Sequence, residues 1–146
     1  MRFLERDDLL SRAEVSPGER FFVRTPSDDT NGAYSMLELV AAPGSGTPMH
    51  IHDNEDEHLI ILEGMARIAN GDETVDLPTG ATLTVRKGVP HAWCNLSEAP
   101  LRMLAIFTPG AIDGLFREIA DGGNIDLASI ASKFGTRIVG PTLLEG

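Results

Sequence analysis

Three side chains that suit a metal ion lie close together near the middle of the sequence. His50 and His52 are two residues apart, so in a strand their side chains point to one face, about 6–7 Å apart along the chain. Glu57 follows a short acidic stretch, and a hairpin would bring its carboxylate back beside both imidazoles. Two imidazoles and one carboxylate suit Fe, Mn, Co, Ni, Cu or Zn. This segment therefore predicts a site for one divalent transition metal ion.

A second segment carries another histidine, which opens a strand after a turn. Pro90 precedes His91 and cannot donate a hydrogen bond to a sheet, so it is typical of the start of a strand. The alternation of side chains along a strand then places His91, Trp93 and Asn95 on one face.

The elements that must position these residues are short strands separated by turns. Signals for turns recur about every ten residues between 33 and 108, which predicts a sandwich or a barrel. Asn70-Gly71 is typical of a two-residue hairpin loop. Phe21-Phe22-Val23 is either a first strand or an arm that pairs with another subunit. The predicted strands are 33–40, 48–52, 57–62, 64–69, 73–77, 81–85, 91–95 and 101–107.

After residue 108 the hydrophobic pattern changes to that of helices. Apolar residues recur at positions i, i+3, i+4 and i+7, which predicts two short amphipathic helices on the outside of the barrel. The first set is Ile112, Leu115, Phe116 and Ile119, and the second is Leu127, Ile130, Ala131 and Phe134.

These segments together resemble the two sequence motifs of the cupin superfamily, small metal-binding β-barrels. The first motif fits at Gly44, His50, His52, Glu57 and Gly64, and the second at Gly80, Gly88, His91 and Asn95. Arg86 stands where the family usually has proline, which changes one turn and removes no ligand. The resemblance implies an all-β fold, a double-stranded β-helix or jelly-roll barrel with short C-terminal α-helices. It implies a single domain over 1–146, with the barrel at about 20–108 and a helical extension at about 109–146.

The resemblance also implies a metal site made of His50, His52, Glu57 and His91, with Glu57 as the catalytic residue that accepts a proton. Similar cupins include dioxygenases, so a metal-dependent dioxygenase acting on an enol or phenolic small molecule is the first expectation. Two alternatives stay open. One is a non-redox metal enzyme, such as an isomerase, cyclase or lyase, and the other is a cupin that binds a small molecule without catalysis.

The composition excludes several classes of partner. The formal net charge is −10, from 12 basic and 22 acidic residues, so nucleic acids and anionic membrane surfaces are not expected as partners. Cys94 is the single cysteine, and the first residues do not form a secretory signal. We therefore expect a cytoplasmic protein that binds a small-molecule substrate, and we expect a homodimer in which arms cover sheet edges.

Other polar and aromatic residues have less specific interpretations. The acidic residues between His52 and Glu57 are expected to form a solvated loop, and His58 to be exposed or at an interface. Asn95 is expected to hold a turn, and Cys94 to pack as a plain thiol. Trp93, Phe107, Tyr34 and Met36 are expected in the core or around a pocket. The candidates for holding a substrate carboxylate are Arg24, Arg67 and Arg102.

Overall fold

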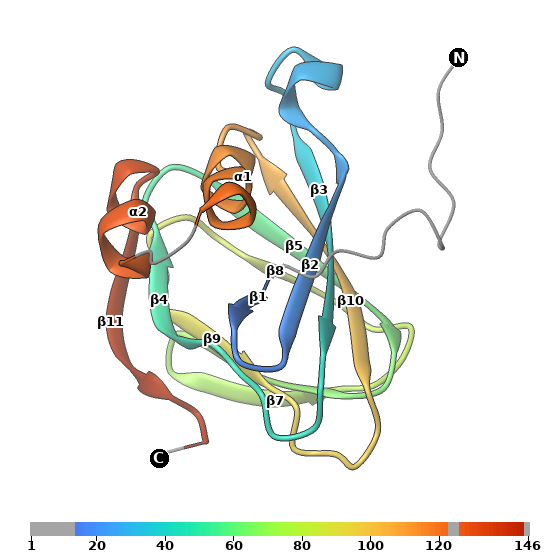
Figure 1. The fold of residues 1–146 in the computed structure, drawn as a ribbon. Helices are drawn as coiled ribbons and strands as arrows, with labels where there is room; N and C mark the ends of the chain where they lie inside the picture. Colours follow the sequence, from blue (N-terminus) through green and yellow to red (C-terminus); the bar gives the residue numbers. More distant parts are fainter. Residues whose placement is uncertain (1–13, 123–125, 145–146) are drawn as a thin grey trace.

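The computed structural model describes residues 14–122 and 126–144 of the chain, which form two antiparallel sheets and two short helices (Figure 1). The six-stranded sheet contains, in spatial order, β1 (Glu14–Ser16), β2 (Glu19–Thr25), β3 (Ser35–Ala41), β10 (Leu101–Thr108), β5 (Asp56–Glu63) and β8 (Thr82–Val85). The five-stranded sheet contains β11 (Thr136–Thr142), β4 (Pro48–His52), β9 (His91–Cys94), β6 (Ala66–Asn70) and β7 (Glu73–Leu77). The predicted all-β jelly roll with C-terminal helices is confirmed.

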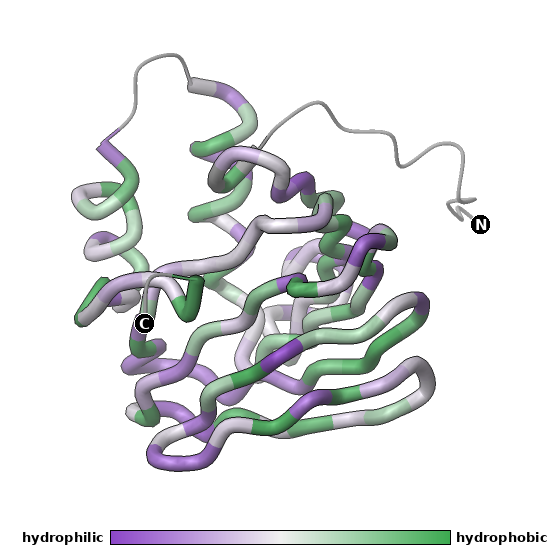
Figure 2. The backbone as a smooth tube through the Cα atoms, turned by 90° about the horizontal axis from the view of Figure 1, so that it is seen from below, coloured by the Kyte–Doolittle hydropathy of each residue, from purple (hydrophilic) through white to green (hydrophobic). Residues whose placement is uncertain are grey.

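The core lies between the two sheets because the strands alternate in hydropathy. Along β10 the side chains of Leu101, Met103, Ala105 and Phe107 are buried, and the residues between them are half-buried. This period of two is what places one face of each strand inside the barrel. Figure 2 shows hydrophobic and hydrophilic residues mixed along the strands, with hydrophilic residues at several of the turns.

Both helices lie at one end of the molecule, and α2 is the one beside β11 (Figure 1). Helix α1 spans Asp113–Asp121 and contacts β1 and β2, whereas α2 spans Leu127–Lys133 and contacts β11. The two helices also contact each other. A short 3₁₀ helix, Ser27–Thr30, joins β2 to β3. None of the helices among the described residues is long and apolar enough to cross a membrane.

Two local expectations need correction, and one open alternative is decided. Strand β11 was not predicted, and since it pairs with β4, the barrel extends beyond the expected boundary near 108. Of the two interpretations of Phe21-Phe22-Val23, the strand is confirmed: the segment is part of β2, which pairs with β3 of the same chain and buries both phenylalanines. Asn70 pairs with Glu73, so the hairpin loop is shifted by one residue from the predicted Asn70-Gly71.

Candidate metal centre

The four predicted ligands meet between the sheets. His50 and His52 lie on β4, and His91 opens β9 directly opposite His50. Glu57 lies on β5, which belongs to the other sheet. The predicted hairpin between the histidines and Glu57 is therefore wrong: the chain after His52 crosses from one sheet to the other. The carboxylate faces the imidazoles across the barrel interior, and does not lie beside them on a neighbouring strand.

Backbone carbonyl groups orient two of the three imidazoles. Nδ1 of His50 lies 2.8 Å from the carbonyl oxygen of Pro48, and Nδ1 of His91 lies 3.0 Å from that of Val89. A carbonyl oxygen only accepts hydrogen bonds, so both Nδ1 atoms carry protons. In each neutral ring the lone pair is then on Nε2. Such fixing of the tautomer by an outer partner is characteristic of histidines that bind metals.

The third imidazole is held by a side chain from the end of the chain. Nδ1 of His52 lies 2.9 Å from Oγ1 of Thr136 on β11. Nε2 of His52 lies 3.0 Å from Oε2 of Glu57, and Nε2 of His91 lies 3.2 Å from the same oxygen. The Nε2 atoms therefore converge on one carboxylate.

The donor atoms of this cluster are close enough to share one ion. One ligand atom from each of His50, His52, Glu57 and His91 lies within 4.8 Å of the others. His52, Glu57 and His91 are buried, and His50 is half-buried. Three imidazoles and a carboxylate, with two of the imidazole tautomers fixed by backbone carbonyls, fit a divalent transition metal ion.

The electrostatics of the cluster also favour a cation. Burial, together with the nearby His91 and His52, lowers the pKa of His50 to about 3, so this ring is neutral near pH 7. Burial acts to raise the pKa of Glu57, but the hydrogen bonds and charges of His52 and His91 outweigh it and the pKa is lowered. The cluster therefore presents an ionised carboxylate and at least one neutral imidazole to a metal ion.

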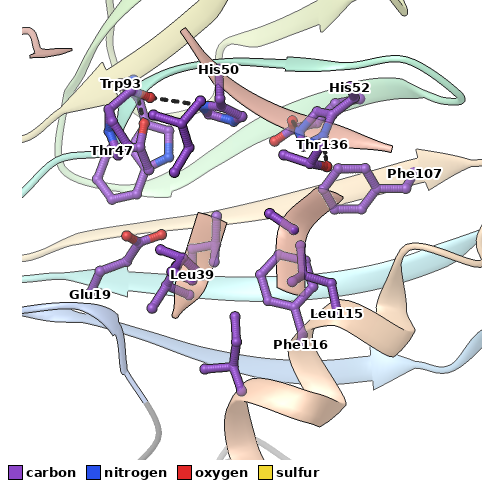
Figure 3. A pocket seen from close by; sticks show the side chains of 17 residues that line it. Glu19, Leu39, Thr47, His50, His52, Trp93, Phe107, Leu115, Phe116 and Thr136 are labelled. Carbon is purple, nitrogen blue, oxygen red and sulfur yellow. Dashed lines mark hydrogen bonds and ion pairs between the residues drawn. The ribbon is translucent and has the colours of Figure 1, made fainter. Parts of the chain in front are cut away.

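An apolar cavity of about 80 Å³ opens beside the cluster (Figure 3). His50, His52 and Glu57 contribute to one wall. Across the cavity from the labelled histidines lie Leu115 and Phe116 of α1 (Figure 3). The remaining lining residues are Val15, Glu19, Leu39, Thr47, Pro48, Trp93, Phe107, Ile119, Leu127, Ala131, Thr136 and Ile138.

The loop between the ligands departs from expectation at one residue. Asp53 is exposed and paired with Arg137, and Asp56 is half-buried and bound to Arg86. Glu55, in contrast, is only 3% exposed, and its Oε1 has no hydrogen-bond partner among the described residues. Burial, with the charges of Glu57 and Asp53, raises the pKa of Glu55 to about 7. The prediction of a wholly solvated loop is therefore wrong at Glu55.

Of the residues with less specific interpretations, some line the cavity and others support the fold. Trp93 and Phe107 line the cavity, whereas Tyr34 and Met36 are not among its lining residues. Asn95 holds a turn, because its side-chain amide donates to the carbonyl oxygens of Ala41 and Ala99, as expected. Cys94 is fully buried, as expected of a packed thiol. His58 is half-buried and hydrogen-bonded to Thr84 and Thr108, so it is less exposed than expected.

None of the three arginine candidates reaches the cavity. Arg24 and Arg102 both bind the buried Glu38 on β3, and Arg67 binds Asp76 on β7. Sequence reasoning also missed Thr136 and Glu19 as residues of the cavity wall. No local pattern distinguishes them, since Thr136 belongs to the unpredicted strand and Glu19 precedes the phenylalanines of β2.

Comparison with known proteins agrees with the fold. Residues 37–107 match the family model described as a cupin domain, Cupin_2. The structure is similar to that of KdgF from Halomonas sp., with a TM-score of 0.69 and 16% sequence identity over 78% of this chain and 98% of that one. It is also similar to the polyketide cyclase RemF from Streptomyces resistomycificus, with a TM-score of 0.65 and 19% identity over 74% and 79% of the two chains. At these identities the likeness establishes the fold alone.

Curated relatives match in sequence over part of their length. Mannose-1-phosphate guanylyltransferase 2 of Escherichia coli O157:H7 is 24% identical over 107 residues, which are 73% of this chain and 21% of the relative. The uncharacterized protein MJ1618 of Methanocaldococcus jannaschii is 29% identical over 75 residues, which are 51% of this chain and 60% of the relative. The chain thus spans about a fifth of the length of the first of these relatives.

Proposed function

Residues 37–107 of this chain are a cupin domain, and from that premise we propose that the protein is a metal-dependent dioxygenase acting on an enol or phenolic small molecule. The observation that carries the proposal is the convergence of His50, His52, Glu57 and His91 beside an apolar cavity, which the first three of these residues line. These four residues would hold one divalent ion of Fe, Mn, Ni, Co, Cu or Zn. When bound, such an ion supplies Lewis-acid chemistry and, for the redox-active metals, electron transfer to dioxygen.

The side chains around the cluster have separate tasks in this reaction. Glu57 is the catalytic residue, because Oε2 can accept the proton of the substrate enol or phenol. The carbonyl groups of Pro48 and Val89 and the hydroxyl of Thr136 keep the imidazoles in one orientation. The apolar side chains of the cavity exclude water from the reacting groups. Both atoms of dioxygen enter the organic product, so the reaction needs no external reductant.

Two measurements test the proposal. Elemental analysis of the purified protein should find one transition metal ion per chain, and dioxygen should be consumed when an aromatic enol such as a flavonol is added. Glu57→Gln should abolish turnover, whereas Glu73→Gln, which changes an exposed glutamate on β7, should leave it unchanged. A chain that purifies without metal and binds none on titration would contradict the proposal.

A non-redox metal enzyme is the second candidate, because the same donors stabilise an enediolate without changing the oxidation state of the metal. A neighbour of similar fold, RemF, is described as a polyketide cyclase, which is chemistry of this kind. Turnover under nitrogen by the Zn²⁺-loaded protein would favour this candidate. Tight binding of a small molecule without turnover, both in air and under nitrogen, would indicate a protein that binds its ligand without catalysis.

A further inference from the structure

The wall of the cavity that faces the metal cluster comes from outside the cupin domain. Leu115 and Phe116 of α1, and Leu127 and Ala131 of α2, line this wall. All four lie beyond residue 107, where the match to the family model ends. The four ligands thus lie within the region that matches the family model, whereas the surface that meets the rest of a substrate lies outside it.

That surface offers no positive charge. Among the described residues that line the cavity there is no lysine or arginine, and outside the ligand cluster the polar ones are Glu19, Thr47 and Thr136. Figure 3 shows Glu19 on the side of the cavity away from His50. Among the described lining residues, therefore, no side chain supplies a positive counter-charge to an anion.

The cationic side chains of α1 and α2 form ion pairs with carboxylates. Every arginine from Arg24 to Arg137 forms an ion pair with an aspartate or glutamate, and none of them lines the cavity. Lys133 of α2 is paired with Glu118 of α1. A carboxylate, sulfonate or phosphate placed between the helices would lose its water and gain no counter-charge, which is a large cost.

We infer that the cavity accepts a substrate whose part remote from the metal cluster is uncharged and largely apolar, and that α1 and α2 reject substrates with an anionic group there. This inference rests on the proposed function for the orientation of the substrate, with its enol or phenol at the ligand cluster. The charge at the opposite end then decides affinity.

A pair of probes of the same shape tests the charge preference. 3,4-Dihydroxyphenyl methyl sulfone and 3,4-dihydroxybenzenesulfonate share a catechol head, and they differ in charge at the other end. A sulfone and a sulfonate are both poor metal ligands, so the head is the group that meets the metal. Calorimetric titration of the Zn²⁺-loaded protein under nitrogen should give a dissociation constant about a hundredfold or more lower for the sulfone. Equal affinities, or no binding of the sulfone, would overturn the inference.

Lysine substitutions on the helical wall test where the preference arises. Ile119→Lys on α1 and Leu127→Lys on α2 each replace a half-buried lining residue with a cation. Each should reduce the preference for the sulfone to less than about tenfold. The matched controls, Ala120→Lys and Ala128→Lys, change exposed residues of the same helices and should keep the wild-type preference. Controls that shift the preference as much as the lining variants would show an effect of net charge and overturn the inference. The two lining variants are independent, so one that fails to fold leaves the other to decide.

Failure of the proposed function would give a different result. If titration shows that Zn²⁺ does not bind, the metal-dependent function is refuted. Phenyl methyl sulfone and benzenesulfonate are then compared on the chelator-treated chain. A remaining preference for the neutral probe that Ile119→Lys removes would support the charge selection without a metal, and no preference would refute it.

Discussion

Thr136 on the last strand holds His52 of the metal cluster through a 2.9 Å hydrogen bond between Oγ1 and Nδ1. Residue 136 opens β11, which pairs with β4 so that Thr136 lies directly opposite His52. The end of the chain therefore supports a ligand that lies 84 residues earlier. The threonine hydroxyl thus orients the imidazole of His52 through Nδ1, as backbone carbonyl groups orient those of His50 and His91.

Replacing this hydroxyl should weaken metal binding without unfolding the barrel. Thr136→Val keeps the branched shape and removes the partner of Nδ1, so the imidazole loses its fixed orientation. We expect the affinity for Zn²⁺ to fall about 10–100-fold, measured by competition with a chelator. Thr142→Val, at the other end of β11, is the matched control and should bind Zn²⁺ as the wild type does. An unchanged affinity in Thr136→Val would show that the bond does not orient His52.

Removing the metal should lower thermal stability and leave a cooperative transition. The barrel has a core of its own, so it should fold without metal. A ligand present at about 100 times its dissociation constant adds roughly 2.7 kcal/mol, and each 1 kcal/mol shifts the midpoint by roughly 2–4 °C for a chain of this size. A chelator should therefore lower the midpoint by about 5–11 °C in a calorimetric scan. His52→Ala should not respond to added metal, and Glu57→Gln should respond weakly. A chelator-treated chain with no transition would contradict a preformed barrel.

The affinity for metal should decrease as the solution becomes acidic, with His91 responding first. Burial lowers the pKa of His91, but the hydrogen bond and charge of Glu57 outweigh burial and leave the pKa raised. A proton therefore competes with the metal at His91 from above about pH 6.5 downward, and below that pKa the affinity should fall about tenfold for each pH unit. His50, with a pKa of about 3, should not compete in this range. Equal affinities for Zn²⁺ at about pH 7 and about pH 4.5 would contradict these ligands.

The buried Glu55 should reduce stability near neutral pH. Its pKa is raised to about 7 from 4.5, so the folded chain binds this proton more tightly than the unfolded chain. The stability due to this proton is complete below pH 4.5 and is lost as the pH rises through about 7. We expect metal-free Glu55→Gln to exceed the wild type in unfolding free energy by about 1 kcal/mol at about pH 8, with no gain at about pH 4. Urea unfolding at both pH values measures this. A gain of equal size at both would exclude the proton as its cause.

We still predict a homodimer. The prediction now depends on an apolar surface of the six-stranded sheet and no longer on an arm. Ile60 on β5 and Leu104 on β10 are paired across the six-stranded sheet, on the opposite side of their strands from the core residues. With Ile106 they form a half-buried apolar surface that a second copy could cover. Light scattering at micromolar concentration should therefore report about twice the chain mass of 15.7 kDa. Leu104→Lys should shift the mass toward the monomer, and a wild type at the monomer mass would refute the dimer.

Much of the barrel and all four members of the cluster follow from the sequence, because the signals are local. Alternation along 48–52 puts His50 and His52 on one face, and their spacing to Glu57 and His91 matches the motifs. The apolar period after residue 108 likewise predicted both helices, which the structure places at Asp113–Asp121 and Leu127–Lys133. A strand or helix pattern depends on neighbours within a few residues, which a single sequence displays.

Only the tertiary structure decided what surrounds the cluster. The burial of Glu55, the position of Glu57 on the opposite sheet and the contact of Thr136 with His52 all join segments that are separate in the sequence or in different sheets. The same holds for the cavity wall, where α1 and α2 contribute apolar side chains and no cation. An acidic residue in a polar loop, or a threonine after a glycine, has no local sign of such a role, since its environment is set by the chain that packs against it.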